Sequence, residues 1–124
     1  MGLILAISFG GALGSVLRYT LSKLVQEKVG IDFPLGTLFV NMTSAFLIGF
    51  FFAYLVERLT ISPALRAFLI TGFLGGYSTF STLTYESYQL LMNGEMFKFA
   101  FYAFGSLLGG TFMTLLGYNL GRII

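Results

Sequence analysis

The sequence contains no cysteine and no histidine, and only 12 of its 124 residues are charged, 7 Lys or Arg and 5 Asp or Glu. Without Cys there are no disulfides and no thiol chemistry, and without Cys and His the usual ligand sets of zinc, haem and iron–sulfur clusters are excluded. The charged fraction of 10% lies far below the roughly 25% of soluble domains. The scattered basic residues make no nucleic-acid patch, and we expect them to set orientation in a bilayer.

Apolar residues fill the rest of the chain, with 56% hydrophobic residues and a mean hydropathy of +0.88. A membrane-spanning helix needs about 20 apolar residues, so the length divides into four spans and leaves no room for a soluble domain. The N-terminal MGLILAIS lacks the pattern of a secretory signal and is expected to begin the first span. We predict an all-α fold, a single transmembrane domain over residues 1–124, with spans at about 3–25, 35–56, 62–91 and 96–120.

The basic residues test the topology of these spans. If the spans alternate, three basic residues fall on each side of the membrane and Arg18 lies inside the first span. One side carries Arg58, Arg66 and Arg122, and the other carries Lys23, Lys28 and Lys98. Orientation follows the Lys/Arg imbalance of short loops, so a balance of zero predicts insertion in both directions. Four helices barely enclose a pathway, so we expect an oligomer, in which antiparallel copies pair about a two-fold axis.

The third span carries TGFLGGYSTFST, residues 71–82, at its centre. Three glycines and several hydroxyls in a span predict an interrupted helix, because unpaired backbone groups survive in a membrane only against protein or a cavity. Interrupted helices expose carbonyls that hold cations and N-termini that attract anions. Phe80 could turn its positive ring edge to an anion, although the residue type alone favours a lipid-facing or core position.

Two rows of small and polar residues run along the second and fourth spans at i, i+4 spacing. The rows are Thr37, Asn41, Ala45 and Gly49 on the second span, and Tyr102, Ser106, Gly110 and Thr114 on the fourth. Each hydroxyl alone can bond to its own helix, and the Asn41 amide can bond to a neighbouring helix or face water or a ligand. Rows that face each other indicate a polar track.

Glycines spaced four residues apart predict close helix contacts. The pairs are Gly10 with Gly14, Gly105 with Gly109, and Gly117 with Gly121. They indicate a bundle and no particular function.

Few charges lie within the spans. Arg18 can anchor the first span by snorkelling to the interface, and Glu86 can sit in a wet vestibule or pair with a basic group. A proton-coupled exporter of the small dual-topology kind would need a central carboxylate in the first span, where this chain has Ala, Gly, Leu and Ser. A non-transporting bundle subunit gives no reason for the break or the polar rows. An enzyme is disfavoured because Glu86 has no evident partner base.

Three segments together resemble the Fluc (CrcB) fluoride channel family: GGALGSVLRY, GTLFVNMTSAFLIG and GFLGGYSTFST, in this order and spacing. The resemblance implies a dual-topology antiparallel homodimer in the plasma (inner) membrane of a prokaryote, with two anion pores and a structural sodium ion at its centre. It implies a passive fluoride-selective ion channel that lets cytoplasmic fluoride leave the cell and so protects against fluoride toxicity.

The resemblance also implies roles for particular residues. The anion pore would comprise Asn41, Phe80, Ser81, Thr84, Tyr102, Ser106 and Thr114; sodium would bind the backbone carbonyls of Gly75 and Ser78; Arg18 and Glu86 would be the vestibule or structural charges. The chain departs from the family pattern at Leu83, where relatives usually carry Phe, and at Gly110, where a hydroxyl is frequent. Because Leu has no polarised ring edge, we expect one ring edge to be missing from each pore.

Overall fold

The computed structural model describes residues 1–30 and 33–124, and this part of the chain is helical without a strand. The α-helices are α1 (Gly2–Val29), α2 (Leu35–Phe50), α3 (Pro63–Arg66), α4 (Gly75–Tyr77), α5 (Phe80–Met92) and α6 (Met96–Ile123). Two π-helical segments, η1 (Phe51–Arg58) and η2 (Ala67–Leu74), continue α2 and α3 without a gap.

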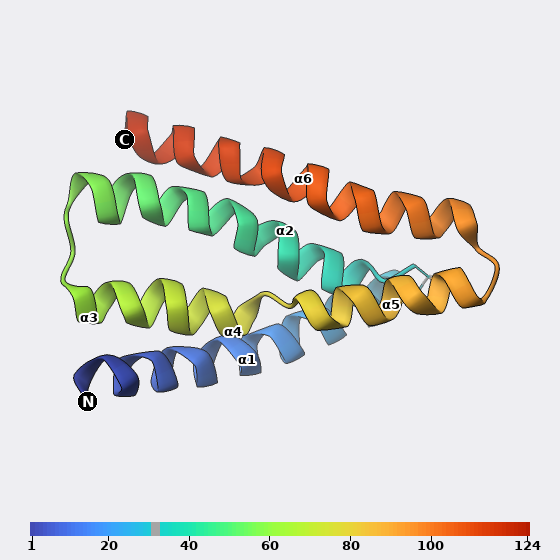
Figure 1. The fold of residues 1–124 in the computed structure, drawn as a ribbon, viewed down its shortest axis with the longest axis horizontal. Helices are drawn as coiled ribbons and strands as arrows, with labels where there is room; N and C mark the ends of the chain where they lie inside the picture. Colours follow the sequence, from blue (N-terminus) through green and yellow to red (C-terminus); the bar gives the residue numbers. More distant parts are fainter. Residues whose placement is uncertain (31–32) are drawn as a thin grey trace.

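The chain passes four times along the long axis of the molecule, and its two termini lie at the same end (Figure 1). Three of these passages are helices long and apolar enough to cross a membrane, Gly2–Val29, Leu35–Arg58 and Met96–Ile123. The remaining passage, from α3 to α5, is divided. At about 1.5 Å per residue, the 13 residues of α5 span only about 20 Å, less than the roughly 30 Å of a hydrocarbon core.

The helix ends follow the sequence signals. The Ser62 side chain accepts a hydrogen bond from the Leu65 amide, with Pro63 in the first turn, so the predicted start of this helix is confirmed. Pro34 directly precedes the first residue of α2. At the end of α1, Gly30 adopts φ 66° and ψ 23°, a left-handed conformation that glycine adopts without a Cβ penalty.

The contact of α1 with η2 and α4 is made by glycines. A Cβ on Gly10 or Gly14 would collide with the backbone of Phe68 or Phe73, and a Cβ on Gly76 would lie 2.6 Å from the Gly11 carbonyl oxygen. The predicted contact role of Gly10 and Gly14 is therefore confirmed. Glycine-rich sequence in the third span thus serves packing against α1, and Gly76 remains helical instead of forming the break.

The contact of α2 with α6 uses the predicted rows. A Cβ on Gly49 would collide with the Thr114 carbonyl, a Cβ on Gly117 would collide with the Phe46 carbonyl, and the Thr114 hydroxyl donates to the Ala45 carbonyl at 2.8 Å. The two rows face each other along this stretch. Gly105 differs from the expectation, because no described atom lies within 4 Å of a Cβ placed there.

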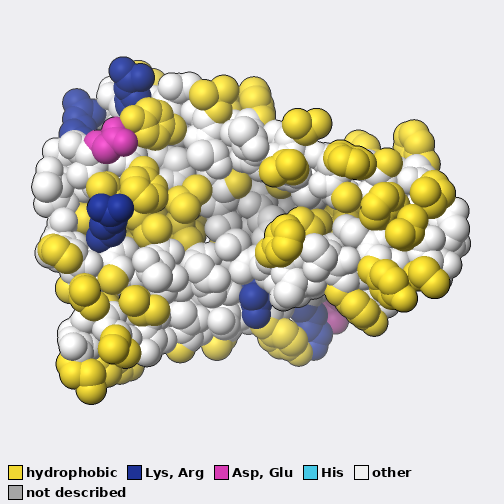
Figure 2. All heavy atoms as spheres, in the orientation of Figure 1, with side chains coloured by type: hydrophobic (Ala, Val, Ile, Leu, Met, Phe, Trp, Pro, Cys, Tyr) yellow, Lys and Arg dark blue, Asp and Glu magenta, His cyan; other side chains and the backbone are white. Residues whose placement is uncertain are grey.

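Little of the chain is buried. The core cluster consists of Val40, Leu74 and Tyr77, and large apolar side chains remain exposed along all the long helices. Figure 2 shows hydrophobic side chains spread across one face, most densely toward its right end, with few charged groups among them. A surface of this kind suits lipid or another protein surface and does not suit water.

Candidate functional site

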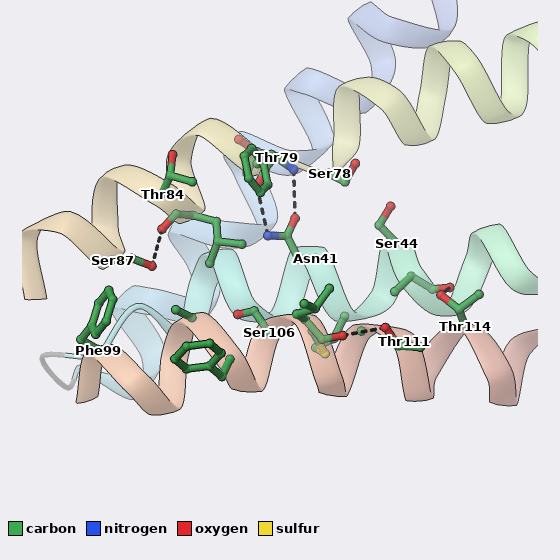
Figure 3. A pocket seen from close by; sticks show the side chains of 18 of the residues that line it. Asn41, Ser44, Ser78, Thr79, Thr84, Ser87, Phe99, Ser106, Thr111 and Thr114 are labelled. Carbon is green, nitrogen blue, oxygen red and sulfur yellow. Dashed lines mark hydrogen bonds between the residues drawn. The ribbon is translucent and has the colours of Figure 1, made fainter. Parts of the chain in front are cut away.

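The third passage leaves the helical conformation at Ser78 and Thr79, which are both extended. The Asn41 side chain of α2 holds this break. Its oxygen accepts the Thr79 amide at 2.9 Å, and its nitrogen donates to the Thr79 carbonyl at 3.1 Å (Figure 3). The first bond replaces the acceptor that a continuous helix would supply to the Thr79 amide, and the second adds a donor to the carbonyl of the N-cap residue of α5. Asn41 therefore bonds to a neighbouring segment, and its amide keeps one N–H beyond these two bonds.

The hydrogen bonds at the break leave two backbone carbonyls without the donors that a helix would supply. In a continuous α-helix the Gly75 carbonyl would accept the Thr79 amide, which here donates to Asn41. The Ser78 carbonyl would accept the Thr82 amide, which here donates to the Thr79 hydroxyl at 3.3 Å and caps α5. Both carbonyls implied as sodium ligands have thus lost their helical donors, and Gly75 is exposed on a single chain.

A cleft of about 860 Å³ opens beside the break, between α2, α5 and α6. We call it the central cleft. Its polar lining consists of Asn41, Ser44, Ser78, Thr79, Thr84, Ser87, Ser106, Thr111 and Thr114, and the remaining lining includes Phe80, Leu83, Tyr88 and Gly110. None of the described residues that line it is charged. Neutral groups in an apolar setting can bind an ion by hydrogen bonds without a fixed counter-charge.

Most hydroxyls of the central cleft are already bonded. Thr84 donates to the Ser81 carbonyl, and Thr114 donates to the Ala45 carbonyl. Ser106 is different, because its hydroxyl is fully buried and has no hydrogen-bond partner among the described residues. A buried polar group without a partner costs about 1–3 kcal/mol, so the Ser106 hydroxyl would gain from a hydrogen-bond acceptor in the cleft.

The aromatic side chains of α5 face outward at the cleft. Phe80 lines the cleft and is 76% exposed, so the described residues of a single chain leave most of its side chain uncovered. Leu83 follows one turn later and also lines the cleft. Ser81 is exposed and lies outside the described lining.

Tyr102 and Glu86 lie together, apart from the central cleft. The Tyr102 hydroxyl donates to the Glu86 carboxylate at 2.7 Å. Glu86 borders a second pocket of about 420 Å³ with Gln26, Phe33 and Glu95. Among the described residues, Glu86 thus pairs with a phenol and not with a basic group. Arg18 lies half-buried on α1, away from the described lining of both pockets.

The structure also brings residues to the cleft that sequence analysis missed. Ser44, Ser87 and Thr111 line it beside the predicted residues. Ser44 stands three residues after Asn41, a spacing that places both on one helix face. The i, i+3 spacing is the sequence signal for Ser44, whereas the i, i+4 row contains Ala45 in its place.

An all-helical chain with three membrane-capable helices and an uncharged cleft beside a broken helix defines a small integral membrane protein of the transporter class. Comparison with known proteins identifies the family. The chain belongs to the family described as CrcB-like protein, Camphor Resistance (CrcB), whose model matches residues 5–118.

Curated relatives match over nearly the whole chain. A protein of Aquifex aeolicus named fluoride-specific ion channel FluC is 59% identical, with 98% of each chain covered. Relatives of the same name from Thermus thermophilus and Hydrogenobaculum are 51% and 45% identical. The Thermus alignment covers 94% of this chain and 93% of the relative, and the Hydrogenobaculum alignment covers 97% and 98%.

Proposed function

We propose that this protein is a passive, fluoride-selective channel and not an enzyme. The observation that carries the proposal is the central cleft, where the Asn41 amide and the unpartnered Ser106 hydroxyl offer neutral donors without an acidic or basic group in the described lining. Membership of the CrcB family and the names of its curated relatives support it. A proton-coupled exporter would need a titratable group at this position.

The chemistry of fluoride matches such a lining. Fluoride is small and strongly hydrated, so a selective path must replace its water with closely placed hydrogen-bond donors. Bonds from neutral donors to an ion are stronger than bonds between neutral groups. The spare N–H of Asn41, the Ser106 hydroxyl and the positive edge of the Phe80 ring supply donors of this kind. Because Phe80 is exposed, its ring reaches a pore only where another surface closes the cleft.

A second copy of the chain would provide that surface. We place four spans in the membrane and propose an antiparallel, dual-topology homodimer. The small core, the exposed Phe80 and the open space beside Gly105 support a partner. The chain path puts the segments with Arg58, Arg66 and Arg122 at one end of the molecule and those with Lys23, Lys28 and Lys98 at the other (Figure 1), and this balance supports insertion in both directions.

The break carbonyls fit a structural sodium ion. Unwound backbone carbonyls are the groups that hold sodium in broken membrane helices. Gly75 and Ser78 would hold it, since both carbonyls have lost their helical donors. One chain supplies two such oxygens and an antiparallel pair supplies four. The ion would join the two breaks at the dimer centre and take no part in conduction.

In the cell, the channel would lie in the inner membrane of a prokaryote and let cytoplasmic fluoride leave down its gradient. This direction protects a cell in which hydrogen fluoride enters and dissociates.

Reconstitution tests the proposal. Liposomes that contain the purified protein and a fluoride gradient should release fluoride rapidly to an external electrode once a potassium ionophore shunts the charge. Chloride should stay inside under the same conditions. Equal release of both halides, or release of neither, would contradict a fluoride-selective channel.

A further inference from the structure

Ser44 stands out among the hydroxyls of the central cleft. It is 5% exposed, lines the cleft, and has no hydrogen-bond partner among the described residues. The usual partner of a helical Ser is the carbonyl four residues back. For Ser44 this is the Val40 carbonyl, which already accepts the Thr43 hydroxyl at 3.0 Å. The Ser44 hydroxyl therefore keeps its proton available to the cleft.

The neighbouring hydroxyls show that this state is uncommon in the described lining of the cleft. Six other Ser and Thr residues of the cleft bond within the chain: Ser78 to Leu74, Thr79 to Thr82, Thr84 to Ser81, Ser87 to Leu83, Thr111 to Leu107 and Thr114 to Ala45. Only Ser44 and Ser106 remain without a partner in the described lining. Both residues are at least nine-tenths buried, and the Ser106 oxygen is also closed to solvent.

The positions of the two free hydroxyls are informative. Ser106 and Ser44 lie on opposite sides of Asn41 along the cleft, and the Ser44 oxygen points away from α2 into the open space (Figure 3). Ser44 is one helical turn from Asn41 toward the end of the molecule where η1 carries Arg58. Asn41 donates one N–H to the Thr79 carbonyl and keeps its second N–H. With this N–H, the two hydroxyls form a short line of available donors along the described part of the cleft.

We propose that Ser44 is a further anion-coordinating residue that extends the donor line past Asn41 toward the Arg58 end. This inference rests on the proposed channel function. A fluoride ion leaving the Asn41 amide on this side would exchange that donor for the Ser44 hydroxyl before it regains water. Thr43, the neighbour, contributes nothing similar because its hydroxyl is bonded to the backbone and to Tyr77.

Efflux from liposomes tests the role of Ser44, with Ser87→Ala as the matched control. Ser87 lines the same cleft and is 7% exposed, but its hydroxyl donates to the Leu83 carbonyl. We expect Ser44→Ala to slow fluoride efflux by about tenfold, the effect of one lost hydrogen bond to an ion. We expect Ser87→Ala to stay within about twofold of the wild type, since its bond is local to one helix.

A second measurement does not depend on ion flux. The chain has no native cysteine, so a Ser44→Cys variant carries a single thiol. Small neutral methyl methanethiosulfonate should modify this thiol, and sodium fluoride should slow the reaction more than sodium chloride at equal concentration. The Ser87→Cys variant should show no difference between the two salts.

The outcomes separate the two proposals. If wild-type liposomes release no fluoride, the channel function fails and the role of Ser44 fails with it. If the wild type conducts and Ser44→Ala conducts equally, only the role of Ser44 is overturned. Dissociation of the Ser44→Ala dimer, without fluoride protection of the thiol, would assign the hydroxyl to a subunit contact and also overturn it.

Discussion

Two regions of this molecule use small residues for opposite purposes. Where α1 meets η2 and α4, glycines bring the backbones together, and little space remains between the helices. Where α2, α5 and α6 diverge, the small residues Ser44, Ser106 and Gly110 leave the central cleft open. The α1 contact holds half of the broken passage rigidly, and the cleft lies beside the other half.

The comparison shows how one break can serve both regions. Asn41 joins them, because its side chain rises from the helix that lines the cleft and bonds to the backbone where the rigid half ends. The backbone groups that lose their helical partners at the break are therefore either bonded to Asn41 or available to bind an ion. Rigid support on one side is what allows open, unpaired donors on the other.

The largest expected effect comes from filling the tight contact. Gly14→Ala would place a Cβ against the Phe73 carbonyl and 2.9 Å from the Tyr77 amide nitrogen, so one backbone must move. Overpacking of this kind costs about 3 kcal/mol. We expect the purified variant to unfold at a clearly lower temperature and to lose its oligomer in size-exclusion chromatography.

Gly11→Ala is the matched control for this change. Gly11 is on the same helix, but a Cβ there would lie 3.7 Å from the nearest described atom, the Gly72 carbonyl oxygen, which is an ordinary contact. Its unfolding temperature should stay near that of the wild type. Equal loss of stability in both variants would show that the α1 contact is not set by close backbone approach.

The next effect comes from the residue that joins the two regions. Asn41→Asp keeps an acceptor for the Thr79 amide, but it removes the donor to the Thr79 carbonyl and the spare N–H, and it adds a negative charge where an anion would pass. We expect fluoride efflux to fall by on the order of 100-fold, about 2.7 kcal/mol. The dimer should persist. Unchanged efflux would remove Asn41 from the pathway.

Much of the fold could be predicted from the sequence, because the apolar runs fix helices and the Ser62–Pro63 signal fixes a start. The site could be predicted less well. Glycines in residues 71–82 predict the break, yet two of the three, Gly72 and Gly76, pack against α1. The break falls at Ser78 and Thr79, where Asn41 accepts the Thr79 amide. Asn41 and Thr79 are 38 residues apart in the sequence, so no local sequence pattern indicates that they bond.

Hydroxyl roles were the least predictable feature. Thr114 and Ser106 occupy the same i, i+4 row, but Thr114 donates to Ala45 whereas Ser106 has no partner in the described chain. Spacing gives the helix face of a side chain. It does not give the carbonyl that happens to lie within reach on the next helix, which decides whether a hydroxyl is free.

A smaller effect is expected from the exposed ring at the cleft. Phe80→Ile removes a polarised ring edge but keeps an apolar side chain at a position that is 76% exposed within one chain. We expect efflux to slow by about tenfold, comparable to the loss of one strong donor to the ion. Tyr88→Leu is a control, because it also removes an exposed cleft-lining ring of α5, two turns away. Equal slowing in both variants would indicate a general effect of aromatic packing.

The smallest expected effect is a gain in fluoride efflux when an aromatic ring is added to the cleft. Leu83 lines the cleft one turn after Phe80, where the resemblance expects a second ring. Leu83→Phe would supply a ring edge next to the open donors, and the cleft of about 860 Å³ has room for the added atoms. Weak ring-edge contacts are worth about 0.5–1.5 kcal/mol, so efflux should rise about threefold with chloride still excluded. If efflux falls instead, the assembled channel has no space for a larger side chain at position 83. The central cleft would then be open only in the single chain, and in the channel it would be packed as closely as the α1 contact.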